Sequence, residues 1–515
     1  MGKIYGLDYG TNGITLAVYL PDWMKSVTLK DSDGDDITPT KFIDGKPWGK
    51  QICGKTAQRA ELVMPCVTSA KLHALEEIAY TEDGVQYNPD YVISSENSHK
   101  ISEQEELEDI VIEELVATHP ADMTQEDVYH YRGILEKNTK PGGNNFVIKA
   151  MLSEPVAAAF AYLNPDMEEQ DLLIADLGGG TADFAIVEFR KLKGEIYISA
   201  YSVYGEKLGG YNWDRLFFDF FKKQLYGKGI AYDKDLKFMK ELLAKCEEIK
   251  INMSTRNDEK VEFDLFSNQN KKYVHFSITK DEYMQIFMKF WGEVKKLCDT
   301  YTKKIDPMQI NKVLLVGGTC SNVLLQKNMR EYFSKAPYQH VKVIAHKEKT
   351  AVAIGAANYA HWVFDEHKKI YLGGKPYEKR NVHVELECSD SMGLECMTRT
   401  GKYYIGNIIQ KGKSFPCTDE RIFGIAENNQ DSILLQVYRN ESKEKLIPLD
   451  EGTLIGKEII KISEITSIPM TTEHLIKATF HMPSQGIVNV ELDILDKNMK
   501  CQGSYCVPNP FQFNK

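Results

Sequence analysis

Two short stretches of this 515-residue chain place an aspartate directly before a loop of glycine and threonine. They read DYGTNG and DLGGGTAD, and in each the aspartate, Asp8 or Asp176, ends an apolar run. Glycine lets backbone N–H groups converge on an anion without interference from a Cβ atom, and threonine adds a hydroxyl donor. Carboxylates repel phosphate, but they hold hydrated Mg²⁺. The stretches therefore predict a site for phosphates and Mg²⁺, with the loop residues Gly10, Thr11, Asn12, Gly178, Gly179, Gly180 and Thr181.

A third glycine loop occurs in KVLLVGGTCSNVLLQKNMREYF. This segment predicts a strand, a turn at Gly317, Gly318 and Thr319, and an amphipathic helix. Two other phosphate-binding motifs are excluded, because the chain has no G-x-x-x-x-G-K-[ST] sequence and Asp183 replaces the last glycine of a G-x-G-x-x-G motif begun at Gly178. Three glycine loops in this order favour a cleft for ATP and Mg²⁺ between two lobes.

The elements around these loops follow from hydrophobic periodicity. Residues 3–20 and 171–189 share one plan, an apolar strand, a loop and a second apolar strand, which predicts two hairpins in two related lobes that face each other. Ser102 and Glu105 have the spacing of a capping box, so an acidic helix is expected to begin there. Further helices are expected over residues 153–163, 211–225, 235–254 and 351–364.

The character of the sequence changes near residue 371. The segment YLGGKPYEKRN is rich in glycine, proline and charge, which is typical of a linker. After it, helical periodicity gives way to short apolar strands separated by turns, such as KYYIGNIIQ, ILLQVYR, LIKATFHM and GIVNVELDIL. This spacing predicts a small all-β sandwich from about residue 382 onward.

Composition and charge exclude several classes of protein. The net charge of −11 argues against coating nucleic acid or a membrane surface, because such partners require basic patches. No run of about twenty apolar residues is present, and the N-terminal MGKIYGLDYG lacks the apolar core of a signal peptide. The ten cysteines form no C-x-x-C motif and are expected to be reduced thiols. We therefore expect a cytoplasmic protein without nucleic-acid or membrane partners.

The three loops, together with SEPVAAAFAY and LGGYNWD, resemble motifs of the heat-shock protein 70 (DnaK-type) chaperones. The resemblance implies an α/β fold: a two-lobed actin-like (ribonuclease H-like) ATPase domain in residues 1–372, followed by a linker over 373–388. It also implies that residues 389–515 form an all-β sandwich that binds peptides, without the helical lid of the family.

The resemblance also implies roles for individual residues. Lys71 corresponds to the catalytic lysine, Glu154 to the residue that orients or deprotonates the attacking water, and Thr181 to a residue lining the γ-phosphate. Asp8 and Asp176 would hold hydrated Mg²⁺. The other implied nucleotide contacts are Gly209, Gly210, Glu247, Lys250, Ser254 and Ser321, in addition to the residues of the three loops. From the residues alone, Lys71 would most often be a surface lysine. Glu154 would be a charge at a helix N-terminus, which is compatible with the implied role.

Some positions depart from the family pattern. Ile251 and Ser321 stand where the family has the two arginines that sandwich adenine. Cation–π stacking by arginine contributes up to about 2 kcal/mol, so we expect ATP binding weaker by roughly 10- to 100-fold and less selective for the base. Pro120 corresponds to the family's switch proline, which is associated with signalling between the two lobes. The sequence match around Pro120 is poor, which puts this signalling role in doubt. His383, Glu385 and Glu387 make the linker polar, so weaker coupling between the domains is expected.

The β domain carries the resemblance to a peptide groove. The family's groove positions correspond to apolar residues here, which favours a slot for an extended apolar peptide. The alternative is that these residues form the core of the sandwich. The positions are Leu394, Phe423, Ala426, Ile433, Leu435 and Ile476.

Together these features favour an ATP-dependent, chaperone-like protein that hydrolyses ATP slowly and binds unfolded or extended polypeptides. The resemblance adds a J-domain cochaperone and a nucleotide exchange factor as partners. Two alternatives remain at this point: a nucleotide-gated scaffold for a dedicated partner that does not refold it, and an actin-like or sugar-kinase member of the same superfamily.

Overall fold

The structure, a computed structural model, divides the chain into two compact units. Unit 1 comprises Met1–Asp122, Ile134–Ile196 and Ser202–Val382, and unit 2 comprises Met123–Gly133, Tyr197–Tyr201 and His383–Lys515. None of the helices described has the length and apolar character needed to cross a bilayer. The described residues are 3–45, 51–61, 64–68, 70–74, 80–82, 85–123, 125–163, 167–232, 234–256, 258–303, 306–346, 349–364, 369–372, 375–378, 382–387, 390–398, 400–415, 417–425, 427–440, 442–484, 487–508 and 511.

Unit 1 contains a mixed five-stranded sheet in the order β3-β2-β1-β8-β9. The first predicted hairpin is confirmed, because β1 and β2 pair antiparallel. Strands β1, β8 and β9 run parallel, so their carboxyl ends meet at one edge, where ligands bind in sheets of this kind. The bounds are β1 (Ile4–Tyr9), β2 (Ile14–Leu20), β3 (Lys25–Thr28), β8 (Glu114–His119) and β9 (Val147–Ser153).

A second sheet of unit 1 contains the strand order β16-β15-β10-β11. The second predicted hairpin is also confirmed, since β10 and β11 pair antiparallel while β15 runs parallel to β10. Whether the two sheets act as two lobes stays a prediction. The bounds are β10 (Gln170–Leu177), β11 (Ala182–Leu192), β15 (Lys312–Val316) and β16 (Lys342–Ala345), and β12 (Glu195–Glu206) follows β11 in the chain.

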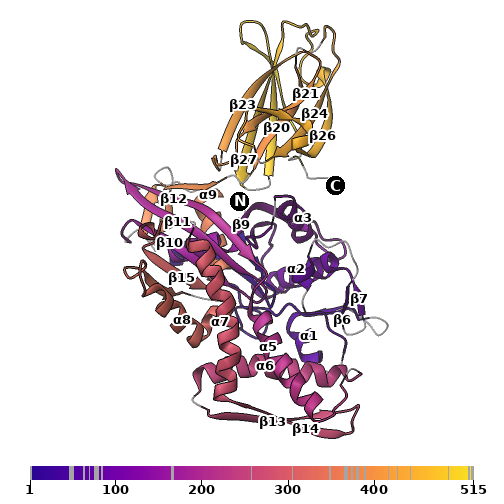
Figure 1. Ribbon diagram of the computed structural model, residues 1–515. Helices are drawn as coiled ribbons and strands as arrows, with labels where there is room; N and C mark the ends of the chain where they lie inside the picture. The colour runs from indigo at the N-terminus through magenta and orange to yellow at the C-terminus, as the bar shows by residue number, and fades with distance from the viewer. Residues whose placement is uncertain are drawn as a thin grey trace. The chain divides into compact units, whose positions relative to one another are not determined.

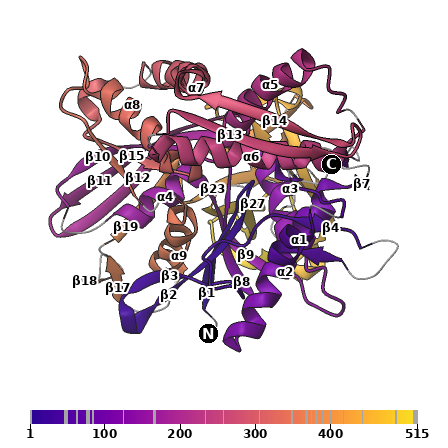
Figure 2. The ribbon, with the colours of Figure 1, turned by 90° about the horizontal axis from the view of Figure 1, so that it is seen from below.

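Two helices of small residues pack closely against each other in unit 1. They are α4 (Glu154–Tyr162) and α9 (Ala351–Phe364), both at predicted positions (Figure 2). A Cβ atom on Gly355 would overlap the carbonyl oxygen of Ala157, and one on Gly6 of β1 would overlap the α9 backbone. Glycine at these two positions therefore lets α9 lie directly on both α4 and β1.

Further helices surround the second sheet and a small hairpin. Trp213 is fully buried and stacks on Phe290 at a centroid distance of 4.8 Å, which joins α5 to α7. The predicted helices at 211–225 and 235–254 are confirmed, and the hairpin β13–β14 lies beside α6 (Figure 1). The bounds are α5 (Gly210–Gly227), α6 (Leu236–Thr255), β13 (Lys260–Ser267), β14 (Lys272–Thr279), α7 (Lys280–Thr302) and α8 (Val323–Phe333).

The predicted capping box at Ser102 is wrong. Helix α2 spans Pro89–Glu108 and begins at Asn88, whose side chain accepts a hydrogen bond from the Tyr91 N–H at 2.9 Å. Ser102 therefore lies inside a continuous helix. Many of the buried residues of α2 are polar, among them Asn97, so hydrophobic periodicity does not reveal its first three turns.

Short elements complete unit 1 and the regions flanking it. Strands lie both near the N-terminus and within the segment predicted as a linker. They are β4 (Phe42–Ile43), β5 (Ile52–Cys53), β6 (Tyr80–Glu82), β7 (Val85–Tyr87), β17 (Lys369–Leu372), β18 (Lys375–Glu378) and β19 (Val382–Glu387), and the remaining helices are α1 (Gly54–Ala60) and α3 (Gln125–Glu136).

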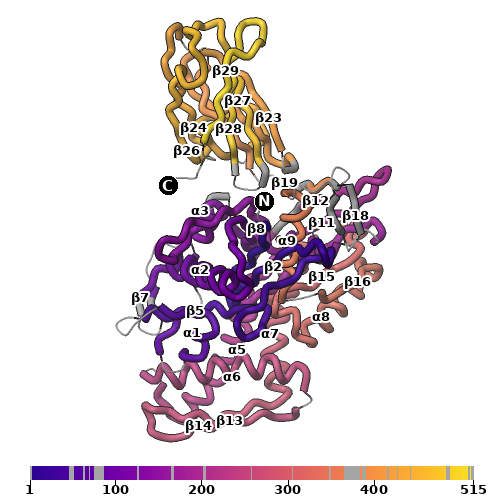
Figure 3. Tube along the Cα trace, turned by 180° about the vertical axis from the view of Figure 1, so that it is seen from behind, coloured from indigo at the N-terminus to yellow at the C-terminus, as the bar shows by residue number. Residues whose placement is uncertain are grey.

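Unit 2 contains two antiparallel sheets, and β23, β24 and β26–β29 are labelled in Figure 3. The strand orders are β25-β21-β20-β24-β26 and β23-β27-β28-β29. All four predicted β-domain strands are present. Alternate residues of β24 face inward, so Ile433, Leu435 and Val437 are buried. The bounds are β20 (Ser391–Met397), β21 (Tyr403–Ile409), β22 (Ser414–Phe415), β23 (Cys417–Gly424), β24 (Ser432–Asn440), β25 (Leu446–Pro448), β26 (Thr453–Lys461), β27 (Leu475–Ser484), β28 (Ile487–Leu495) and β29 (Cys501–Cys506).

Candidate functional site

The tips of the two predicted hairpins lie against each other. Each tip is closed by the same bond, from the Gly10 N–H to the Gly13 carbonyl and from the Gly178 N–H to the Thr181 carbonyl, both at 2.9 Å. A Cβ atom on Gly179 would lie 2.9 Å from the Asn12 side chain. A Cβ on Gly180 would lie 2.9 Å from the Thr11 hydroxyl oxygen. These glycines are therefore needed for the close approach of the two loops.

The remaining glycine segments join the same site. The Gly178 carbonyl accepts hydrogen bonds from the Gly210 N–H at 3.0 Å and from the Thr319 hydroxyl at 2.7 Å. A Cβ on Gly209 would lie 2.5 Å from the Gly179 carbonyl oxygen. Gly317 has a φ of +83° and lies against the Asp176 carboxylate, where a Cβ would overlap Oδ1. The structure thus brings together all the predicted glycine loops, whereas Gly318 faces open space.

Three aspartates at these loops have raised pKa values. Burial raises the pKa of Asp8 to about 7 and that of Asp183 to about 8, and the negative charge of Glu154 adds to both shifts. The pKa of Asp176 lies well above its ordinary value for the same two reasons. Asp183 Oδ1 accepts a hydrogen bond from the Ala121 N–H at 2.8 Å, so it holds the segment after Pro120 against the second loop.

The donor set fits hydrated Mg²⁺ in its chemistry. The positive charge of Lys71 opposes the rise in the pKa of Asp8 and Asp176 but does not cancel it, and a divalent cation would supply more positive charge there. Within the described part of the chain, no three His, Cys, Asp or Glu side chains are close enough to enclose a metal ion directly. Magnesium keeps several waters and needs only one or two carboxylates, so Asp8 and Asp176 are suitable residues to hold it.

Lys71 and Glu154 form a buried ion pair. Lys71 lies in a short 3₁₀ helix (Ala70–His73), and its Nζ donates to Glu154 Oε1 at 2.6 Å. Their side chains are 6% and 11% exposed, so Lys71 is not a surface lysine. Glu154 is also the first residue of α4, followed by Pro155, so it occupies the favourable helix N-terminus that the sequence alone indicated.

The residues predicted to bind adenosine lie beside the third glycine loop. Lys250 is buried and pairs with Asp214 at 2.8 Å, and its backbone carbonyl accepts a bond from the Asn322 side-chain amide at 3.3 Å. Burial raises the pKa of Asp214 to about 6, although the Lys250 charge opposes this. Ile251, where the family has arginine, is 55% exposed. Glu247 and Ser321 are exposed, and Ser254 is half-buried and bonds the Ile251 carbonyl at 2.7 Å.

Sequence reasoning missed two buried polar residues of this region. Asp214, the partner of Lys250, lies within the LGGYNWD motif but was not singled out. His119 lies at the carboxyl end of β8, beside Pro120, and is only 2% exposed. A histidine at the end of a mostly apolar strand, LVATH, was the available signal.

The predicted peptide-binding residues are mostly inside the β sandwich. Leu394, Ile433, Leu435 and Ile476 are each at most 8% exposed, and Phe423 is half-buried. Ala426 lies outside the described residues. In this conformation the four buried residues belong to the core, which agrees with the alternative that the sequence left open. Their role in peptide binding stays a prediction.

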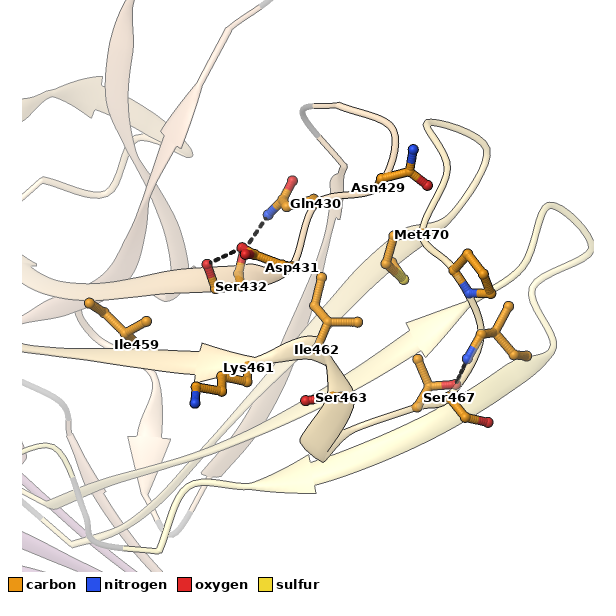
Figure 4. A pocket seen from close by; sticks show the side chains of 13 residues that line it. Asn429, Gln430, Asp431, Ser432, Ile459, Lys461, Ile462, Ser463, Ser467 and Met470 are labelled. Carbon is orange, nitrogen blue, oxygen red and sulfur yellow. Dashed lines mark hydrogen bonds between the residues drawn. The ribbon is translucent and has the colours of Figure 1, made fainter.

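A pocket of about 520 Å³ lies elsewhere in unit 2 and contains none of the predicted groove residues (Figure 4). Its walls come from the start of β24, the end of β26 and the loop that leads to Met470. Ile459 of β26 is 71% exposed and pairs in register with Leu434, which is 55% exposed. This surface therefore offers accessible apolar side chains beside a pocket.

Comparison with known proteins gives two findings. The family model described as "Hsp70 protein" matches residues 146–504. The chaperone protein DnaK of Buchnera aphidicola subsp. Schizaphis graminum (strain Sg) is 25% identical over 539 residues, an alignment that covers 95% of this chain and 76% of that protein.

Proposed function

Because the chain belongs to the Hsp70 family, we propose that it is an ATP-dependent, chaperone-like protein that hydrolyses ATP at the glycine loops of unit 1. The observation that carries this proposal is the convergence of the glycine loops on two aspartates, the half-buried Asp8 and the buried Asp176. Backbone N–H groups in such loops suit the phosphates of ATP. Family membership disfavours the sugar-kinase and actin-like alternatives.

In this proposal each residue has a separate task. Gly10–Asn12 and Gly178–Thr181 would cradle the phosphates, and Asp8 and Asp176 would hold hydrated Mg²⁺. The metal ion would neutralise charge on the phosphates. Lys71 reaches the γ-phosphate, and Glu154 orients the attacking water and accepts its proton. Phosphate binding then requires the 2.6 Å pair between Lys71 and Glu154 to loosen, so that both groups can face the nucleotide.

The test of this proposal is ATP turnover in purified wild type and in Lys71→Ala. Since loss of a positioned catalytic group costs roughly 10²- to 10⁴-fold, we expect phosphate release to fall by that factor. Lys245→Ala removes a lysine from the exposed surface of α6 and serves as the matched control with unchanged turnover. Equal turnover in wild type and Lys71→Ala would contradict the assignment.

We further propose that unit 2 binds extended apolar peptide segments, since the DnaK relative is named a chaperone protein and the predicted groove positions are apolar. The predicted groove and the pocket near Ile459 are separable by substitution. Fluorescence anisotropy of a labelled apolar peptide should show weaker binding to Phe423→Ala and unchanged binding to Ile459→Asp. The reverse result would assign the peptide to the pocket, and no binding by wild type would reject peptide binding.

A nucleotide-gated scaffold is the second candidate. It is favoured by Ile251, which is exposed where relatives have an adenine-stacking arginine. A scaffold would bind ATP and Mg²⁺ without measurable turnover, with or without peptide, which the ATPase assay distinguishes. A J-domain cochaperone and a nucleotide exchange factor belong to the chaperone proposal alone.

A further inference from the structure

His119 lies deep in unit 1, beside the proposed catalytic pair. It ends β8 and pairs in register with Ser153, the residue before Glu154. Its neighbour Thr118 approaches Asp8 Oδ1 at 3.4 Å. The imidazole therefore occupies the same sheet edge as Asp8 and the Lys71–Glu154 pair.

The hydrogen bond of His119 fixes which ring nitrogen carries the proton. Nδ1 lies 2.8 Å from the Pro120 carbonyl oxygen. A carbonyl oxygen only accepts, so Nδ1 must donate. Burial and, to a smaller extent, the charge of Lys71 lower the pKa of His119 to about 4 although the bond to Pro120 opposes them, so the ring is neutral. Nε2 then presents a lone pair.

Nε2 is a buried acceptor for which the described residues provide no hydrogen-bond partner. Buried polar atoms are nearly always paired, with protein or with a bound water. The Lys71 ammonium is a suitable source of a donor for this site, because its charge contributes to the lowered pKa of His119. The ammonium carries three N–H bonds, one of which donates to Glu154. A neutral acceptor also holds an ammonium without adding negative charge where phosphates are to bind.

We propose that His119 is a positioning residue for Lys71: one bound water bridges the two side chains, accepting from the Lys71 ammonium and donating to His119 Nε2. His119 then keeps Lys71 at the sheet edge when Glu154 turns to the attacking water. This inference rests on the proposed function, in which Lys71 is a catalytic residue.

The first test uses nucleotide-free protein and is independent of activity. In ¹⁵N-histidine NMR, His119 should show an unprotonated Nε2 whose resonance moves on Lys71→Met. His361, which is buried and stacked on Tyr19, is the internal control and should not move. A protonated Nε2, or a resonance unchanged by Lys71→Met, would overturn the proposal.

The second test separates binding from turnover. His119→Leu should lower kcat for ATP about tenfold and leave the dissociation constant of ADP unchanged, because only the Lys71 contact is lost. His119→Gln restores an acceptor and should recover much of kcat. Unchanged kcat in His119→Leu, or equal loss of kcat and of ADP binding, refutes the role. If wild type fails to hydrolyse ATP, the proposed function fails while the NMR result still decides whether the contact exists.

Discussion

Among single residues, Lys100 on α2 is an unusual case, because it is fully buried and its Nζ has no hydrogen-bond partner among the described residues. Burial lowers its pKa, while the charges of Glu103 and Asp31 act in the opposite direction. The larger effect is burial, so the folded protein disfavours the charged form.

Lys100→Met should therefore increase the free energy of unfolding by about 1 kcal/mol at pH 7. A lysine with a lowered native pKa destabilises the fold while it is charged, and this loss diminishes as the pH rises toward its ordinary 10.5. The increase in the free energy of unfolding caused by Lys100→Met should therefore be smaller at pH 10 than at pH 7, as measured by urea unfolding. Lys149→Met, at a half-exposed ion pair with Glu114, is the control with little effect. A less stable Lys100→Met protein would show that attraction to Glu103 and Asp31 outweighs burial.

The adenine side of the nucleotide site gives a second prediction for one residue. Ile251→Arg places a guanidinium where Ile251 is 55% exposed. Stacking on adenine should tighten ATP binding up to about tenfold and increase the preference for ATP over GTP in calorimetric titration. Val323→Arg adds the same charge on neighbouring α8 and should change neither the affinity for ATP nor the preference for ATP over GTP. Equal effects of the two substitutions would indicate charge attraction instead of stacking.

At the scale of elements, the contact between α4 and α9 depends on Gly355, where a Cβ would overlap the Ala157 carbonyl oxygen. Gly355→Ala should lower the free energy of unfolding by about 1–3 kcal/mol, because two packed backbones must separate. Gly292, inside α7, has open space where a Cβ would lie, so Gly292→Ala should stabilise by about 0.5–1 kcal/mol. Thermal or urea unfolding of the two variants measures these opposite changes in the free energy of unfolding. Changes of the same sign in both variants would contradict the prediction.

Elements in which apolar residues repeat at a regular spacing could be located from the sequence, whereas the start of α2 could not. The hairpins and α9 combine apolar runs with glycine or alanine, so their sequences alone locate them. Helix α2 buries Ser94, Asn97 and Gln104, whose side chains bond to backbone carbonyls outside the helix. Such partners are distant in sequence, so no local pattern reveals them. For the same reason the 2.6 Å contact between Lys71 and Glu154 came only from the fold.

At the scale of the whole molecule, the resemblance is uneven along the chain. The Hsp70 family model matches from residue 146, so Asp8, Lys71 and His119 precede the matched segment. The glycine loop of 178–181 lies within it, and the DnaK alignment covers 95% of the chain. The candidate site thus combines residues inside the segment that the family model matches with residues before it, and Pro120, where the sequence match is poor, belongs to the second group.

The placement of α4 and α9 has one more consequence. Helix α4 follows β9 of the first sheet but packs on β10 and β11, whereas α9 follows β16 of the second sheet but packs on β1 and β2. Each half of unit 1 thus supplies the helix that covers the other half's hairpin. A chain severed after Leu163 would yield two fragments that each expose an unshielded apolar surface. We therefore expect neither fragment to complete its part of unit 1 alone, and these two parts should regain structure only by complementation.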